Sequence, residues 1–286
     1  MDFPDYFADA ESSFDEAKYV IFGVPYDKTS SFRPGARNGP KEIRKASWNF
    51  ETYNFRTGFD FSDVKFHDYG DLEVKDKTPE RMVEEVSKFT SKLLKNNKIS
   101  IAIGGEHSIT PGIVNAYPKD IFVVSLDAHI DFRQKYENSP YNHACATRRI
   151  SDHVGIDNVA VIGIRSAEKE EFLEAKKLGL FYIDSYEIRE NGIEQALGKT
   201  KKHIGNNKVY LTLDIDVIDP AFAPGTSTPE PFGISPFDIL KCIDAFSSNL
   251  IGFDIVEVCP DFDNGQTALL AAKLIRSVIE AFESRK

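Results

Sequence analysis

Short apolar runs rich in β-branched residues recur at fairly even intervals along the 286-residue chain and alternate with segments of helical periodicity. Because each run is apolar almost without interruption, it is typical of a strand buried on both faces of a parallel sheet. Eight runs have this character, at residues 18–24, 64–69, 99–103, 121–126, 158–163, 180–183, 208–215 and 251–258. We therefore expect a sheet of about eight strands.

Segments between the runs carry the apolar stripes of amphipathic helices. Residues 79–97 align Met82, Val83, Val86, Phe89, Leu93 and Leu94 after Pro79, and the last segment aligns Ala271, Leu274, Ile275, Val278, Ile279 and Phe282. The alternation predicts one α/β domain over residues 1–286, with three αβα layers and a mostly parallel sheet. No repeat or Pro/Gly/Ser-rich linker marks an internal boundary. Ligands of such a sheet bind beyond the carboxyl ends of its strands.

The charge balance narrows the classes of partner. The chain has 35 Lys and Arg against 45 Asp and Glu, a net charge of −10, which argues against nucleic-acid binding and favours a cationic small molecule. An acidic N-terminus and the absence of 18 successive apolar residues predict a protein that is neither exported nor membrane-spanning. Cys145, Cys242 and Cys259 form no CxxC pair, so we expect small core residues and a cytoplasmic location.

Candidate ligand groups follow four of the predicted strands. His107 comes after the strand at 99–103, and Glu257 ends the last one. Asp127, His129 and Asp131 follow the strand at 121–126, and Asp214 and Asp216 repeat the same alternate spacing. Alternate side chains of an extended segment share one face. Five such groups, four of them anionic, would repel one another in a partly dry pocket unless a divalent cation lay among them.

The donor types indicate which metal this would be. Carboxylates and imidazoles without thiolate suit manganese better than a tetrahedral structural zinc. His107 brings the donors to six, more than one mononuclear site normally uses, which predicts two metals sharing a water. Taken singly, Asp127 or Asp216 would be a cap or turn acid, Glu257 a solvated carboxylate and His107 a loop histidine; the cluster outweighs these alternatives. His67, His153 and His203 lie outside it and are expected to be structural or exposed.

Four segments, GGEHS, SLDAHID, LTLDIDVIDPAFAPGTSTPEPFG and DIVEVCP, closely resemble in this order the ureohydrolase family of arginases and agmatinases. GVPYDKTSSFRPGARNGPKEIR is similar to that family's N-terminal motif, and the resemblance extends from about residue 17 to the last helix. It implies an arginase-like fold and two Mn²⁺ per subunit. The implied ligands are His107, Asp127, His129, Asp131, Asp214 and Asp216.

The same resemblance implies roles for further residues. Asp131 would orient a bridging hydroxide that attacks the guanidinium carbon, and Glu257 would bind the guanidinium NH₂ groups. His143 matches the family's proton-shuttle histidine, and Thr228 falls where the family has a threonine near the guanidinium. The products would be urea and a primary amine, and the subunits would form a homo-oligomer, a trimer or hexamer.

Substrate choice rests on the loop between Asp131 and His143. Arg133 stands where arginases have an Asn, which favours the agmatinase branch, with agmatine cleaved to putrescine and urea in polyamine biosynthesis. A cation facing agmatine's terminal ammonium would repel it, so Arg133 and Lys135 are expected to turn away or to pair with acids such as Glu137. Guanidinobutyrate and N1-aminopropylagmatine are the alternative substrates.

Two other hypotheses stay open on the sequence alone. A catalytically silent metal-binding relative would keep the fold, although every ligand position is filled. A two-metal phosphoesterase would need an Arg/Lys clamp on phosphate, and none is evident near the ligand strands. Residues 29–40 are Gly/Pro-rich without a phosphate-loop pattern, and we expect a structured loop near the pocket mouth or a subunit contact.

Overall fold

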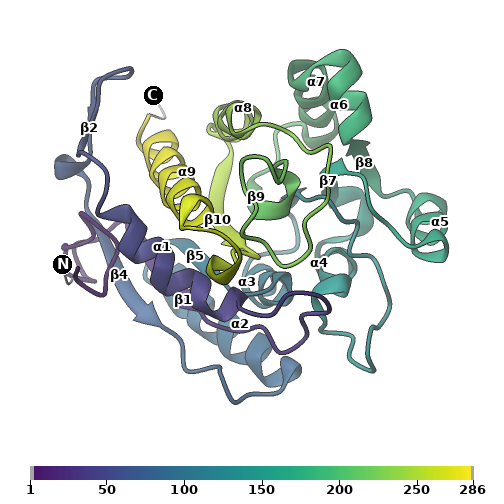
Figure 1. Ribbon diagram of the computed structural model, residues 1–286, viewed down its shortest axis with the longest axis horizontal. Helices are drawn as coiled ribbons and strands as arrows, with labels where there is room; N and C mark the ends of the chain where they lie inside the picture. Colours follow the sequence, from purple (N-terminus) through teal and green to yellow (C-terminus); the bar gives the residue numbers. More distant parts are fainter. Residues whose placement is uncertain (1–2, 285–286) are drawn as a thin grey trace.

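The computed structural model describes residues 3–284, which build an eight-stranded sheet in the order β4-β1-β5-β10-β9-β6-β7-β8 (Figure 1). Every neighbouring pair in it is parallel. The strands are β1 (Tyr19–Val24), β4 (Phe66–Asp71), β5 (Ile99–Gly104), β6 (Phe122–Leu126), β7 (Val159–Ile164), β8 (Phe181–Asp184), β9 (Val209–Asp214) and β10 (Leu250–Val256). Each coincides with one of the eight apolar runs, so the predicted α/β sheet is confirmed.

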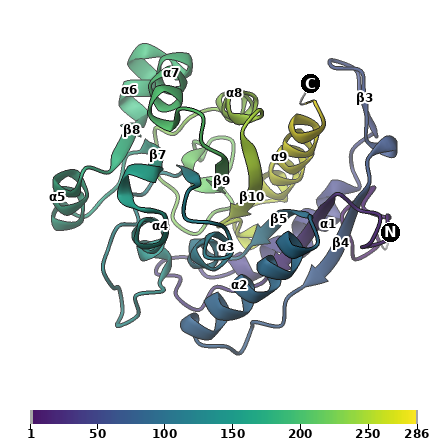
Figure 2. The same cartoon turned by 180° about the vertical axis from the view of Figure 1, so that it is seen from behind.

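Helices cover both faces of the sheet and make three layers (Figures 1 and 2). One face carries α1 (Gly39–Ser47), α6 (Ser185–Asn191), α7 (Ile193–Ile204), α8 (Pro236–Phe246) and α9 (Gln266–Glu283). The other carries α2 (Pro79–Lys95), α3 (Thr110–Val114), α4 (Ala146–Val154) and α5 (Lys169–Leu178). Successive residues of β1 enter opposite cores, Tyr19 and Ile21 one and Val20 and Phe22 the other. This two-sided burial explains why the strands are apolar without interruption.

The helix α2 follows the predicted stripe closely. Thr78 caps it by accepting a hydrogen bond from the Arg81 N–H, and Pro79 fits the first turn because no intrahelical partner is needed there. Four of the six predicted apolar side chains are fully buried, and Phe89 and Leu94 are half-buried. The helix ends at Lys95, two residues earlier than the pattern indicated.

Smaller elements were not predicted. A hairpin of β2 (Tyr53–Asn54) and β3 (Phe59–Asp60) projects beyond α9 (Figure 1). Single 3₁₀ turns lie at η1 (Ala36–Asn38), η2 (Phe61–Asp63), η3 (His107–Ile109), η4 (His143–Cys145), η5 (Ile156–Asn158), η6 (Ile215–Val217) and η7 (Pro260–Phe262). The expectation of a loop throughout 29–40 is wrong at its end, because η1 and α1 begin within it.

The strand order positions the candidate site. β5, β10, β9 and β6 are four adjacent strands in the middle of the sheet, although they come from distant parts of the chain. Their carboxyl ends therefore meet at one edge, where parallel sheets bind ligands. Among residues 3–284, no helix combines the length and apolar character needed to cross a membrane.

Candidate metal centre

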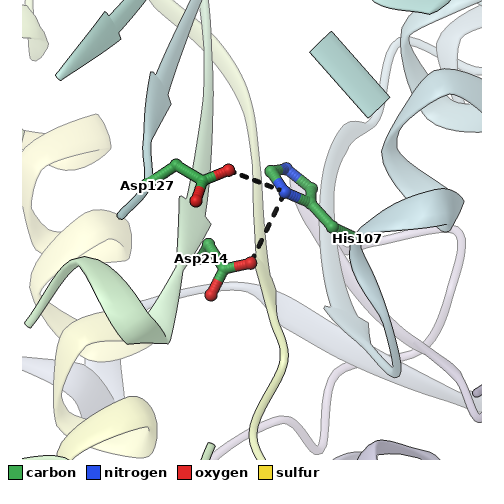
Figure 3. Close-up of side chains that lie close together, drawn as sticks. All are labelled: His107, Asp127 and Asp214. Carbon is green, nitrogen blue, oxygen red and sulfur yellow. Dashed lines mark ion pairs between the residues drawn. The ribbon is translucent and has the colours of Figure 1, made fainter. Parts of the chain in front are cut away.

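His107 follows β5 and is almost completely buried, with 1% of its surface exposed. The turn that delivers it needs glycine, because a Cβ at Gly105 would overlap the carbonyl oxygen of Tyr26. The Nδ1 atom of His107 lies 3.1 Å from Asp127 Oδ2, 3.2 Å from Asp131 Oδ2 and 3.5 Å from Asp214 Oδ2. Figure 3 shows the Asp127 and Asp214 carboxylates turned toward this nitrogen. One imidazole and three carboxylates thus converge.

A second donor set lies beside the first. His129 Nδ1 is 2.9 Å from Asp216 Oδ2 and 3.8 Å from Asp127 Oδ1. The two groups that could hold an ion are His107, Asp127 and Asp214, and Asp127, His129 and Asp216. Asp127 belongs to both, one oxygen facing each histidine. A carboxylate shared in this way is what a pair of neighbouring ions requires.

Two buried atoms of the site lack the partner that burial demands. His107 Nδ1 and Asp127 Oδ2 have no hydrogen bond of acceptable geometry, although they lie 3.1 Å apart. Buried polar atoms are nearly always satisfied, so these two unpartnered atoms fit a site that binds a cation. All donors are nitrogen or oxygen, and no cysteine belongs to either triad. The residues fit divalent ions that accept mixed carboxylate and imidazole ligands, such as manganese.

The carboxylates are aimed by backbone N–H groups. Asp127 Oδ1 accepts from the His129 N–H at 2.6 Å, and Asp214 Oδ1 accepts from the Asp216 N–H at 3.0 Å. Asp216 Oδ1 in turn accepts from the Ala128 N–H at 3.1 Å. Asp214 and Asp216 each use one oxygen for the backbone and turn the other toward a histidine, whereas Asp127 Oδ1 accepts from the backbone and also faces the His129 ring.

A buried polar chain behind the site fixes the His107 ring. Its Nε2 lies 3.2 Å from Thr212 Oγ1, which donates to Asp254 Oδ1 at 2.6 Å. Because the Thr212 proton is committed to Asp254, the hydroxyl oxygen faces the ring as an acceptor. His107 therefore donates from Nε2, and Nδ1, which faces the carboxylates, is the ring nitrogen that would bind a metal. Tyr210 also donates to Asp254, at 2.7 Å, so this buried carboxylate is satisfied without a cationic side chain.

The pKa values of the clustered side chains are strongly shifted. Burial alone would lower the pKa of His129, but the Asp216 and Asp127 carboxylates raise it to about 10. Burial, reinforced by the charge of Asp127, raises the pKa of Asp131 to about 7. Burial raises the pKa of Asp214 well above its usual value, with Asp216 and Asp127 adding to it. These shifts have one cause, the crowding of buried carboxylates, and a positive ion among them would offset it.

Asp131 and Glu257 share an unusual backbone conformation. Their φ angles are 47° and 64°, in the left-handed region that non-glycine residues rarely adopt. Such conformations concentrate at functional sites, where surrounding structure holds them in place. Both side chains line a cavity of about 150 Å³. The other predicted site residues that line it are His129, His143, Asp214 and Thr228.

Glu257, which lines this cavity, is held by two donors. Its Oε1 accepts from the His107 N–H at 2.7 Å, and its Oε2 accepts from the Ser227 hydroxyl. Burial raises the pKa of Glu257 to about 8, and the nearby Glu106 carboxylate adds to this rise. Thr228 lies beside it and donates to Asp216 Oδ2 at 3.3 Å. Both residues therefore line one cavity with three of the predicted ligands, His129, Asp131 and Asp214.

His143 lines the same cavity. Its backbone N–H donates to Thr29 Oγ1 at 3.0 Å. Its ring nitrogens Nδ1 and Nε2 lie 3.3 Å from Thr29 Oγ1 and Ser31 Oγ, respectively. Burial and the neighbouring His129 lower the pKa of His143 to about 4. Ser31 lines the cavity, so the first part of the 29–40 segment lies beside the pocket as predicted.

Sequence reasoning missed the residues that support these groups. Glu106 is fully buried and accepts from the Thr29 N–H at 2.8 Å, the Thr29 hydroxyl at 2.7 Å and Ser108 at 2.6 Å. It thereby fixes the segment that contacts His143. The sequence signal that could have identified Glu106 is its position in the GGEHS motif, from which only the histidine was predicted as a site residue. Arg165 was also missed; its guanidinium donates to five backbone carbonyls, including Asp216 O at 2.6 Å and Glu230 O at 2.7 Å.

Arg133 does pair with an acid, but the expected partner was wrong. Its Nε lies 3.3 Å from Glu171 Oε2, and no ion pair between residues 3 and 284 joins it to Glu137. Glu171, which is buried in the first turn of α5, pairs with Arg133 in place of the loop residue Glu137. Lys135 is exposed and lies outside the cavity lining.

The remaining histidines and cysteines are structural, as predicted. The Nδ1 of His67 lies 2.8 Å from Ser12 O, His153 Nε2 lies 3.0 Å from Tyr117 O, and His203 stacks on Phe181. Cys145, Cys242 and Cys259 are free and buried.

Comparison with known proteins identifies the family. The sequence profile described as the arginase family matches residues 17–280. The chain belongs to the arginase family. It is 38% identical to an agmatinase of Halalkalibacterium halodurans over 94% of each chain. It is 36% identical to an N(1)-aminopropylagmatine ureohydrolase of Thermococcus kodakarensis, over 91% of this chain and 89% of the other.

Solved structures agree with this assignment. The crystal structure of an agmatine ureohydrolase of Thermoplasma volcanium is 41% identical and superposes with a TM-score of 0.93, covering 99% of this chain and 96% of that chain. The arginase-like fold and the ureohydrolase family expected from the motifs are therefore confirmed. The chain is a ureohydrolase, a hydrolase of C–N bonds in linear amidines, and it carries the two donor sets of a binuclear metal centre.

Proposed function

We propose that this chain is a binuclear manganese hydrolase that cleaves agmatine to putrescine and urea, a reaction of polyamine biosynthesis. The observation that carries the proposal is the pair of donor triads sharing Asp127, two members of which, His129 and Asp214, line the same cavity as Glu257 and His143. Similarity to agmatinases over nearly the whole chain supports the choice of substrate.

The six predicted ligands would hold the two ions. One ion would lie among His107, Asp127, Asp131 and Asp214, and the other among Asp127, His129 and Asp216. When bound, such a pair of ions supplies a water whose pKa is low enough for it to act as a nucleophile near neutral pH.

Glu257 and Asp131 would prepare the attack. The guanidinium group of the substrate is planar and cationic, and the Glu257 carboxylate can accept charge-assisted hydrogen bonds from its NH₂ groups. This contact fixes the reacting carbon near the donors. Asp131 lies 3.2 Å from His107 Nδ1, so its carboxylate would orient the attacking water and accept its proton.

His143 would serve the departing amine. An amine leaves readily only as its protonated form, and His143 lines the cavity and can relay a proton to it. With a pKa lowered to about 4, the ring is neutral at rest and would pass on a proton gained during the reaction. Thr228, which donates to Asp216, would contact the guanidinium from the side.

N1-aminopropylagmatine is the second candidate substrate. The Thermococcus kodakarensis relative named for it is 36% identical, close to the 38% of the Halalkalibacterium halodurans agmatinase. Both substrates have cationic tails. Guanidinobutyrate has an anionic tail and is disfavoured, because Glu171 already neutralises the cation that would receive it.

A urea assay tests the proposal and separates its alternatives. Manganese-loaded protein should release urea fastest from agmatine, in a panel with N1-aminopropylagmatine, guanidinobutyrate and arginine. If urea were released faster from another compound of the panel, that compound would be assigned as the substrate. If no compound released urea, the result would favour a catalytically silent relative.

We also propose that the protein is a cytoplasmic homo-oligomer, a trimer or hexamer. Light scattering coupled to size-exclusion chromatography would give the mass of the assembly. A monomer of 32.2 kDa at micromolar concentration would refute the oligomer.

A further inference from the structure

Arg133 is the only Lys or Arg among the described residues that line the cavity. Its guanidinium lies over the Tyr136 ring, 4.5 Å from the ring centroid, and its Nε is 3.3 Å from Glu171 Oε2. An unpaired cation here would repel a substrate tail ending in an ammonium group. The side chain that decides the charge of this wall is therefore the partner of Arg133.

Glu171 is held in place by more than its ion pair. Its side chain is 6% exposed, against 31% for Arg133. Glu171 Oε1 accepts from the Phe132 N–H at 2.6 Å, and Oε2 accepts from the Glu168 N–H at 3.4 Å as part of the capping box of α5. Bonds from both the loop after β6 and the start of α5 thus fix this carboxylate beside the guanidinium.

The pairing sets the charge that a substrate tail meets. With Glu171 ionised, the pair adds no net charge to the wall, and the other ionisable residues that line the cavity are carboxylates, histidines and Tyr136. Without Glu171, one full positive charge would stand in a partly enclosed site, where charges a few ångströms apart interact strongly.

We propose that the Arg133–Glu171 ion pair determines substrate class, because Glu171 cancels the only Lys or Arg charge among the described residues that line the cavity and so admits guanidino substrates with cationic tails. The pair would equally remove the attraction for tails that end in a carboxylate. This inference rests on the proposed function, since it concerns the tail of the same substrate.

Glu171→Gln tests it by removing the charge while keeping the shape and an acceptor for the Phe132 N–H. For the manganese-loaded variant we expect kcat/KM to fall roughly tenfold for agmatine and to rise roughly tenfold for guanidinobutyrate. The double variant Arg133→Gln/Glu171→Gln has a neutral wall again and should return the ratio of the two values to near that of the wild type.

Glu174→Gln is the matched control. Glu174 lies on the same helix and pairs with Arg148, Nη1 to Oε1 2.8 Å, but is outside the cavity lining. This variant should leave both kcat/KM values unchanged. Manganese content and melting temperature, measured on every variant, would identify any that has lost its metal or its fold.

Calorimetric binding of two small probes gives a readout independent of turnover. Wild-type protein should bind putrescine more tightly than 4-aminobutanoate, and Glu171→Gln should reverse the order. A folded Glu171→Gln variant whose substrate ratio and probe preference both match the wild type would overturn the inference. Absence of urea from every guanidino substrate would instead refute the proposed function, and the probe preference would still decide the role of the ion pair.

Discussion

Replacing Thr212 by valine removes one hydroxyl from the buried chain that fixes the His107 ring. In the wild type this oxygen lies 3.2 Å from His107 Nε2 and donates to Asp254 Oδ1 at 2.6 Å. Valine has nearly the same shape, so the change creates almost no cavity. It leaves the histidine N–H without its acceptor and the carboxylate without its shortest donor.

The magnitude follows from these two losses. A hydrogen bond to a charged group contributes about 1.5–3 kcal/mol, and a buried unsatisfied donor costs about 1–3 kcal/mol. Because Asp254 keeps its bond from Tyr210, we expect a total near the lower end of the summed range, about 3 kcal/mol, and a melting temperature lowered by about 6 °C. A His107 ring free to turn should weaken manganese binding roughly 10- to 100-fold.

Competition with a chelating dye would measure the affinity, and calorimetry the melting temperature. Thr200→Val is the matched control, since Thr200 is also fully buried but donates to Ala196 O at 2.9 Å within α7. It should lower stability and leave manganese affinity unchanged. If folded Thr212→Val bound manganese as tightly as the wild type, the proposed tautomer control would be refuted.

Three further predictions concern the cluster itself. Asp127→Ala should lose both ions, because the shared carboxylate is removed; an unchanged metal content by plasma mass spectrometry would contradict its bridging position. His143→Ala should lower turnover roughly 100-fold or more while keeping both ions, and loss of metal would argue against a proton-transfer role. Without metal, burial raises the pKa of Asp131 to about 7, with Asp127 adding to the rise, and that of Glu257 to about 8. The folded protein then binds these protons more tightly than the unfolded chain, so stability falls as pH rises from about 4 to about 8. The melting temperature of metal-free protein should therefore decrease as the pH rises over this range. Added Mn²⁺ should raise the melting temperature most at the alkaline end. A melting temperature that increased with pH in the absence of metal would contradict the burial of these acids.

The strands were predictable and their order was not. Burial on both faces leaves continuous apolar runs, and these marked all eight strands of the sheet. Which strands become neighbours depends on how crossovers pack, and β5 beside β10 joins parts of the chain that no local pattern connects. The hairpin β2–β3 was not predicted because two-residue strands have no measurable periodicity.

The site was predictable where the donors sit at strand ends in alternate positions. Asp127, His129 and Asp131 are an example, although the extended backbone assumed for them is wrong at Asp131, whose φ angle is 47°. Asp216 likewise lies in the 3₁₀ turn η6 and not in an extended segment. The residues that hold these ligands in place were not predictable. Thr212 and Asp254 occur inside strands, where they resemble ordinary strand residues. Glu171 looks like any acid in the first turn of a helix, and only the folded chain brings it to Arg133.

The central claim is that the clustered carboxylates are compatible with one another only when two divalent cations lie among them. Titrating chelator-treated protein with Mn²⁺, while measuring bound metal and urea release together, tests it most directly. We predict negligible activity without metal and a plateau at two ions per chain. Full activity in the metal-free protein, or a plateau at one ion, would contradict the account.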